Sequence, residues 1–112
     1  MDATTAREKS SVNVTDWNAC YNKGDGIISL SCTVSAGGGG GISGVGLMLN
    51  NSGGITLASS YVELSTDCQS ATPALNLPPG NLKVGDRVMG VVSGEADGQH
   101  YFFEQELTIG NC

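Results

Sequence analysis

Residues 27–35 have the sequence Ile27-Ile28-Ser29-Leu30-Ser31-Cys32-Thr33-Val34-Ser35 and indicate the fold more clearly than any other segment. Positions 28, 30, 32 and 34 are apolar, and the positions between them are serine or threonine. This strict alternation has the period of a β-strand that buries one face and leaves the other in water. The stretch therefore predicts one strand of a sheet whose inner face packs against a second layer.

Segments of similar character lie on both sides of this strand. Most alternate β-branched or other apolar residues with polar ones, and none has a helical period of useful length. We count seven to eight short strands, which predicts an all-β sandwich or barrel. The segments expected to be strands besides 27–35 are 12–17, 42–49, 55–64, 74–77, 87–95 and 99–109.

Turn residues separate these strands. Asn50-Asn51-Ser52-Gly53-Gly54 predicts a hairpin turn, and Ala96-Asp97-Gly98 predicts a tight one. Within 55–64 the apolar face changes near Ser59-Ser60, which predicts a bulge or a crossing between sheets. Residues 18–26 and 65–72 are polar and are expected to be loops.

The length of 112 residues fits a single domain. We expect residues 1–11, which are polar and have no period, to form a flexible N-terminal arm. The domain proper is then 12–112. The five consecutive glycines at 37–41 predict a mobile loop, because they have no side chains to pack and a high ordering cost.

Charge and hydropathy exclude two classes of partner. Charged residues make up 14% of the chain and the net charge is −6. The five basic residues are scattered, so we expect no nucleic acid and no anionic lipid surface as partner. No apolar stretch approaches the roughly 20 residues of a membrane helix, so no membrane insertion is expected.

The four cysteines, Cys20, Cys32, Cys68 and Cys112, are too far apart for a CxxC motif. Widely spaced pairs in a domain with few charges predict two disulfides and an oxidising compartment, so we expect an extracellular, periplasmic or cell-surface location. Three pairings are possible. An up-and-down order of strands favours Cys20–Cys112 with Cys32–Cys68 over the sequential pairing.

Residues 74–109 carry a family resemblance. A short strand, the pattern L-x-x-G-D-x-V at 82–88, and a long hairpin follow one another, with Gly85-Asp86 and then Val88, Gly90 and Val92 as the core of the pattern. This third of the chain resembles the last strands of immunoglobulin-like and fibronectin type III sandwiches. The resemblance implies a two-sheet, immunoglobulin-like antiparallel sandwich. The chain departs from antibody domains because 87–95 contains no cysteine and Trp17 lies in the first strand.

The residues offer little catalytic chemistry. His100 is the single histidine and is expected on the solvent side of the last strand. We therefore expect no enzyme activity, no cofactor and no transition-metal site. Asp25, Asp86 and Asp97 are weak calcium candidates, since acidic loop positions bind calcium in some sandwiches, although Asp-Gly is also a common turn.

Two groups of residues are candidates for binding. Loops at the strand ends contribute the first group, and an exposed pair in the last hairpin forms the second, unless the N-terminal arm covers that sheet. A sugar-binding surface with several aromatic rings cannot be assembled from the sequence. The loop candidates are Gly37, Gly39, Gly41, Gln69 and Ser70, and the exposed pair is Met89 and Phe102.

The hypothesis for function is a secreted or cell-surface, non-enzymatic module for binding or assembly, of the adhesin or surface-structure kind, with a protein or glycan ligand. Two alternatives stay open. One is a secreted inhibitor of an extracellular enzyme, using the loop at 37–41 or a loop at 69–73 held by Cys68. The other is a filament subunit that self-associates through residues 1–11.

Overall fold

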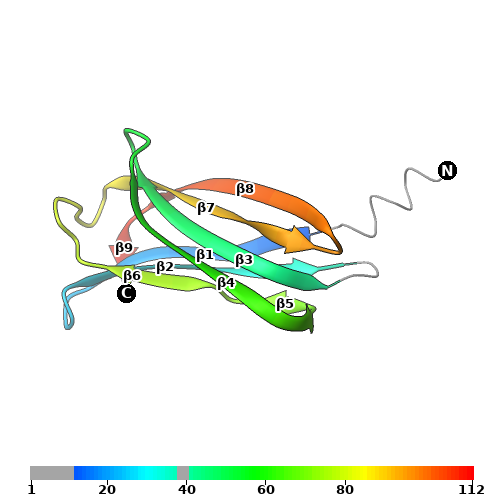
Figure 1. Ribbon diagram of the computed structural model, residues 1–112. Coiled ribbons are helices and arrows are strands. Elements are labelled where there is room, and N and C mark those ends of the chain that lie inside the picture. Colours follow the sequence, from blue (N-terminus) through cyan, green and yellow to red (C-terminus); the bar gives the residue numbers. More distant parts are fainter. Residues whose placement is uncertain (1–11, 38–40) are drawn as a thin grey trace.

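The computed structural model describes residues 12–37 and 41–112, with the backbone alone for 65–67. The fold is an all-β sandwich of two layers (Figure 1). The strands follow one another closely along the chain, as the frequent turn residues predict. The expected arm at 1–11 lies outside the described residues. The strands are β1 (Val12–Asn22), β2 (Ile27–Ala36), β3 (Ile42–Asn51), β4 (Thr56–Cys68), β5 (Ser70–Ala71), β6 (Ala74–Leu77), β7 (Arg87–Ala96), β8 (Gln99–Thr108) and β9 (Gly110–Asn111).

The strands form a five-stranded and a four-stranded sheet. In the five-stranded sheet the order is β5-β2-β1-β9, and β6 also pairs with β2. In the four-stranded sheet the order is β4-β3-β7-β8. The expectation of antiparallel pairing throughout is wrong at one place, because β9 runs parallel to β1, with Cys20 beside Gly110. The chain leaves β8 and crosses to the other sheet, where it meets β1 in the same direction.

The core lies between the sheets and follows the predicted alternation. Ile28, Leu30 and Val34 of β2 are fully buried, and the inward residues of β3 and β7 are buried as well. The serines and the threonine between them on β2 stay partly exposed. Burial of such aliphatic side chains contributes about 1.5–3 kcal/mol each. The inward residues of β3 and β7 are Ile42, Val45, Leu47, Leu49, Val88 and Val92.

The sandwich has two distinct ends. At the C-terminal end lie the turns 23–26, 52–55 and 78–86, and there the Cys112 amide donates to the Tyr21 carbonyl. At the other end, here called the glycine end, lie residues 36–37, 41–42, 68–70 and 96–99. Two backbone hydrogen bonds join these segments, from Asp97 N to Gly41 O and from Ala36 N to Gln69 O.

The cysteine prediction is half right. Cys20 and Cys112 form a disulfide with their Cα atoms 5.0 Å apart. The predicted Cys32–Cys68 bond is wrong, and both thiols are free. Cys68 lies at the glycine end, beside Gln69, whose carbonyl accepts a hydrogen bond from the Ala36 amide. Cys32 lies four residues before Ala36 in β2. Four residues of strand span roughly 13 Å. A disulfide needs Cα atoms about 4.4–6.8 Å apart.

Two strands are longer than predicted, which corrects the loops expected at 18–26 and 65–72. β1 runs to Asn22 because a bulge between Thr15 and Asn18, with Asp16 at φ 57°, lets pairing to β2 resume. β4 runs to Cys68. Its pairing with β3 is irregular at two places, opposite Leu49–Asn50 and opposite Ile42–Gly44, and neither is at Ser59. The last predicted strand ends at Thr108, one residue early, before the short β9.

The predicted hairpin turns are confirmed. Asp97 and Gly98 have φ values of 54° and 75°, as a two-residue turn of type I′ requires between β7 and β8. In the β3–β4 turn the Asn51 side-chain oxygen accepts hydrogen bonds from the amides of Gly53 and Ile55. These turns fix the register of the four-stranded sheet and so the positions of the residues on its outer face.

Candidate functional site

The outer face of the four-stranded sheet brings two aromatic residues into one row. Pairing places Tyr61 of β4 beside Gly46 of β3, Gly46 beside Ser93 of β7, and Ser93 beside Phe102 of β8. Directly paired residues point to the same face, so this row crosses the whole sheet. The side chains of Tyr61 and Phe102 are 57% and 62% exposed. Two aromatic residues thus stand about three strand spacings, or roughly 14 Å, apart, with small residues between them.

Tyr61 lies across the glycines of β3. A Cβ atom at Gly44 would collide with the Tyr61 hydroxyl, and one at Gly46 would lie 3.0 Å from Tyr61 Cδ1. Position 44 therefore has to be glycine for the ring to keep its place, and a side chain at position 46 would push the ring away from the backbone. The ring presents a flat surface to solvent. The sequence leaves Tyr61 unplaced, and the signal that could have located it is the spacing of Gly44 and Gly46 opposite an aromatic residue.

The row next to the aromatic row has an apolar centre, formed by Met48 and Val91. Met48 of β3 pairs with Val91 of β7, and Val91 pairs with Glu104 of β8. Val91 is 3% exposed although it belongs to the outer face and not to the central core cluster. Neighbouring side chains therefore cover it from the solvent side. The Thr56 hydroxyl lies 3.5 Å from Met48 Sδ at the β4 side of this row.

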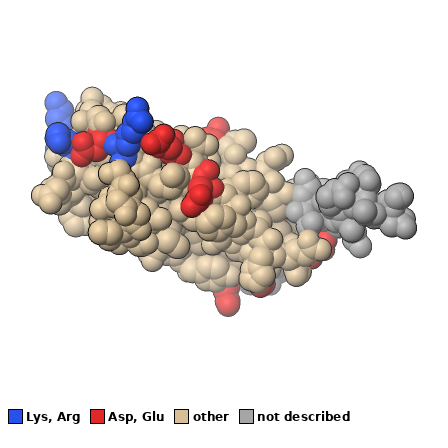
Figure 2. Space-filling view, turned by 90° about the horizontal axis from the view of Figure 1, so that it is seen from above, with Lys and Arg blue, Asp and Glu red and all other residues tan. Residues whose placement is uncertain are grey.

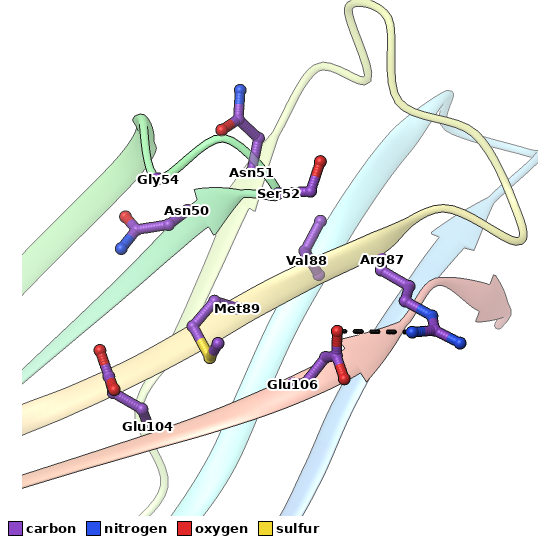
Figure 3. A pocket seen from close by; sticks show the side chains of 9 residues that line it. All are labelled: Asn50, Asn51, Ser52, Gly54, Arg87, Val88, Met89, Glu104 and Glu106. Atoms are coloured by element: carbon purple, nitrogen blue, oxygen red, sulfur yellow. Dashed lines mark ion pairs between the residues drawn. The ribbon is translucent and has the colours of Figure 1, made fainter.

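A shallow pocket of about 240 Å³ opens on the same face, toward the C-terminal end (Figure 3). Figure 3 shows that Arg87 and Met89 come from β7, Glu104 and Glu106 from β8, and Asn50 from β3. The Arg87 guanidinium lies 3.7 Å from the Glu106 carboxylate. The lining combines amide, carboxylate and thioether groups. Its full set is Asn50, Asn51, Ser52, Gly54, Arg87, Val88, Met89, Glu104 and Glu106.

Charged groups flank the aromatic row on both sides. On the glycine-end side, Glu63 and Glu95 both pair with Gly44, and His100 Nε2 lies 3.4 Å from the Glu95 carboxylate. On the other side lie Glu104 and the pocket. Figure 2, a view from above, shows the visible basic side chains near one end, next to acidic ones, and most of the remaining surface uncharged. The row itself carries no charge.

The structure places the predicted pair Met89 and Phe102 on one face but not in contact. Met89 pairs with Glu106 and Phe102 with Ser93, so the Val91–Glu104 row lies between them. Met89 belongs to the pocket and Phe102 to the aromatic row. His100 is exposed on this face, as predicted, with 85% of its side chain accessible.

The predicted loop candidates gather elsewhere, at the glycine end. Gly37 is exposed after β2, and Ser70 lies in β5 beside Ser35. Gly41 is buried, and its carbonyl accepts a hydrogen bond from the Asp97 amide. Gly39 lies outside the described residues. Since Cys68 is a free thiol, no disulfide holds the Gln69 loop.

The three calcium candidates do not converge. Asp25 and Asp86 lie at the C-terminal end and Asp97 lies at the glycine end. The Asp86 carboxylate accepts from the Lys83 amide and lies 3.5 Å from Lys83 Nζ, so it stabilises its own turn. Within residues 12–37 and 41–112, no group of three or more His, Cys, Asp or Glu side chains gathers for a metal ion. The same ranges contain no helix long and apolar enough to span a membrane.

The groups with shifted pKa values lie in the core, not on the outer face. Burial raises the pKa of the Cys32 thiol to about 11. Burial, with smaller contributions from Tyr61 and Cys32, raises the pKa of Tyr101 to about 12. The Tyr101 hydroxyl donates to the Gly44 carbonyl at 2.9 Å. Both groups stay protonated at neutral pH, so the buried thiol is not a nucleophile.

Comparison with known proteins gives a likeness of fold. No family model matches the chain, and no curated protein matches it. Among solved structures, a β-glucuronidase of Bacteroides uniformis matches 88% of this chain with a TM-score of 0.60 at 14% identity. A β-glucosidase of Thermotoga neapolitana matches 94% with a TM-score of 0.49 at 12% identity. The chain spans 12% and 20% of those two chains, so it is similar to a small part of each.

Proposed function

We propose that this chain is a non-enzymatic binding module of an extracellular, periplasmic or cell-surface protein, and that it binds a neutral glycan on the outer face of its four-stranded sheet. The observation that carries the proposal is the row that joins Tyr61 and Phe102 across Gly46 and Ser93. Exposed apolar surface of this kind, with polar groups around it, is typical of ligand-binding sites.

The shape of the row fits a sugar chain. A sugar ring has an apolar face that packs on an aromatic ring, and hydroxyls at its edge that need hydrogen-bond partners. The flat Tyr61 ring and Phe102 offer the first kind of contact, and Ser93 between them offers the second. Since the row is uncharged and carboxylates lie on both sides of it, an anionic glycan would be repelled.

The remaining fold features support a module of this kind. A Cys20–Cys112 disulfide is compatible with an oxidising compartment. The β6-β2-β1 and β4-β3-β7-β8 strand orders support the finer designation of an immunoglobulin-like or fibronectin type III-like sandwich. The β-glucuronidase likeness covers 12% of that enzyme, which is consistent with a part that accompanies catalysis without performing it.

Titration of the ¹⁵N-labelled chain with soluble neutral β-linked oligosaccharides, chosen from a glycan array, tests the proposal. We expect amide shifts in β3, β7 and β8 around the row. Phe102→Ala should lower the affinity for the oligosaccharide at least tenfold. Ile55→Ala should keep it, because Ile55 is equally exposed, at 62%, but lies in the β3–β4 turn. Shifts confined to the glycine end, or equal loss in both variants, would contradict the proposal.

A further inference from the structure

The two edges of the four-stranded sheet differ in their protection against pairing with another strand. β8 carries His100, Glu104 and Glu106 along its length. Charged side chains of this kind keep an edge strand from adding to another sheet. β4 has one charged residue between Thr56 and Leu64, which is Glu63, and no proline or basic residue. Between the two irregularities of its pairing with β3, residues 58–63 of β4 thus form a regular edge with one charged residue and no proline.

β4 also extends beyond the layer that should cover its inner face. Val62 pairs with the buried Val45 and so points inward, yet it is 50% exposed. Leu57 is 41% exposed. The cause is the edge of the other sheet, where β5 and β6 have only two and four residues.

Two apolar hollows line this open side. One lies between β4 and the β5–β6 segment, and includes Val62, Leu64 and Pro73. The second lies near the C-terminal end, between Leu57 and Leu77. An edge strand with unpaired backbone groups and an apolar flank offers both the hydrogen bonds and the buried area that a further strand needs.

We propose that β4 pairs with β4 of a second copy of this chain, antiparallel, about a two-fold axis at Ser60. The two four-stranded sheets then become one continuous eight-stranded sheet. A two-fold interface uses the same patch twice, so β4 has to be complementary to itself.

The sequence of β4 meets this requirement. In this register Val62 of one copy lies opposite Ala58 of the other, on the inner face. The two-fold axis generates the same pair a second time. Glu63 lies beyond this pair, next to the irregularity at Leu57 of the other copy. The two Glu63 carboxylates are then six residues apart along the strand direction, or roughly 20 Å. This is beyond the screening length of about 8 Å at physiological salt, so they do not repel.

A second copy fits this edge better than the chain's own residues 1–11. That segment contains Arg7, Glu8 and Lys9 in succession. The segment also contains Asp2, so a strand of seven residues built from it would place at least one charge against the apolar hollows whichever face points inward, at a cost in desolvation. β4 itself offers Ala58, Ser60 and Val62 at those positions.

Sedimentation equilibrium of the full chain over a wide range of concentrations tests the proposal. We expect the apparent mass to rise from 11.4 kDa toward twice that value. Val62→Lys should weaken the association at least tenfold, because it places a charge at the centre of the interface. Val84→Lys should leave it unchanged, since Val84 has similar exposure, at 42%, but lies in the 78–86 loop. The thermal stability of each variant is first compared with that of the wild-type chain, and only variants that match it are used.

Hydrogen exchange of the wild-type chain gives a second readout that depends on no variant. Amides of β4 that point away from β3 should gain protection with concentration, while the outer amides of β8 should not. A chain that stays monomeric, or a dimer that survives Val62→Lys or disappears when residues 1–11 are removed, would overturn the proposal. The test is independent of glycan binding, because Phe102→Ala should leave the dimer intact.

Discussion

Trp17 and Gly90 meet between the two sheets and fix their spacing. The bulge at Asp16 turns Trp17 of β1 toward β7, and a Cβ atom at Gly90 would lie 2.6 Å from Trp17 Cζ3. No side chain fits at position 90 unless the indole moves. The tryptophan that packs across the core thus comes from the first strand, whereas in antibody domains it comes from the third.

Gly90→Ala should therefore destabilise the domain by about 1–3 kcal/mol, the usual cost of overpacking. The measurement is the midpoint of urea unfolding. Gly110→Ala is the matched control: a Cβ atom there meets nothing within 4 Å, and we expect a change within about 0.5 kcal/mol. Equal effects in the two variants would show that the contact with Trp17 does not limit position 90.

The buried thiol and phenol make stability depend on alkaline pH. The folded chain holds the Cys32 proton up to about pH 11 and the Tyr101 proton up to about pH 12, above their ordinary values of 9.0 and 10.0. Between these values the unfolded chain binds fewer protons than the folded one, so stability falls as pH rises. The contribution is fully present below about pH 9.

We expect the free energy of unfolding to decline steadily from about pH 9 upward. Cys32→Ala and Tyr101→Phe should each make this decline shallower, although both lower stability at pH 7. Urea titrations at several pH values measure the slope. A thiol reagent at pH 8 gives a further check: Cys68, half-buried at the end of β4, should react in the folded chain, and Cys32 only after unfolding. A slope that neither variant changes would contradict this account.

At the scale of single strands, the sequence predicts best where alternation and turn chemistry agree. β2 and the β7–β8 hairpin match expectation because strict period 2 and an Asp-Gly turn point to the same structure. At the end of β1 a bulge between Thr15 and Asn18 interrupts the alternation, and at the end of β4 residues 65–67 are all polar in sequence, so no continuous pattern distinguishes strand from loop. β9 has two residues and exists because of a tertiary contact, the pairing with β1.

The β7–β8 hairpin depends on its turn. Gly98 has φ 75°, a conformation that costs an alanine roughly 1 kcal/mol or more. We expect Gly98→Ala to lower stability by about that amount and to speed hydrogen exchange at the adjoining ends of β7 and β8. Asp97→Gly should be nearly neutral, because glycine adopts the φ of 54° at position 97 freely. An unchanged hairpin in Gly98→Ala would show that the strands alone set the register.

The candidate site shows what a sequence leaves out about side chains on a sheet. Met89 and Phe102 could be assigned to an outer face from alternation alone. Tyr61 could not, because the row that joins it to Phe102 depends on the register of β4, β3, β7 and β8 together. The hairpin turns set that register only together with the bulge at Leu49–Asn50, which has no local signature. The sequence could predict which residues point to the outer face of the sheet, but not which of them lie side by side there.

At the scale of the whole molecule, one covalent bond joins the first strand to the end of the chain. The Cys20–Cys112 disulfide spans 92 positions, and a cross-link of that length stabilises by about 4.6 kcal/mol in the chain-entropy model. Cys112→Ser should therefore lower the free energy of unfolding by about this amount, as should a reductant. Cys68→Ser should change it little. A loss below about 1 kcal/mol in Cys112→Ser would show that β9 pairing holds the terminus unaided.

The same bond decides how the domain would respond to mechanical load. A pulling force applied at Val12 and at Cys112 passes along the first nine residues of β1 and then through the Cys20–Cys112 bond. The 91 residues between the two cysteines lie outside this force path, so the sandwich bears little of the tension. The domain would act as a short, nearly inextensible link. Under a reductant, the same pull would unravel the chain and release its hidden length.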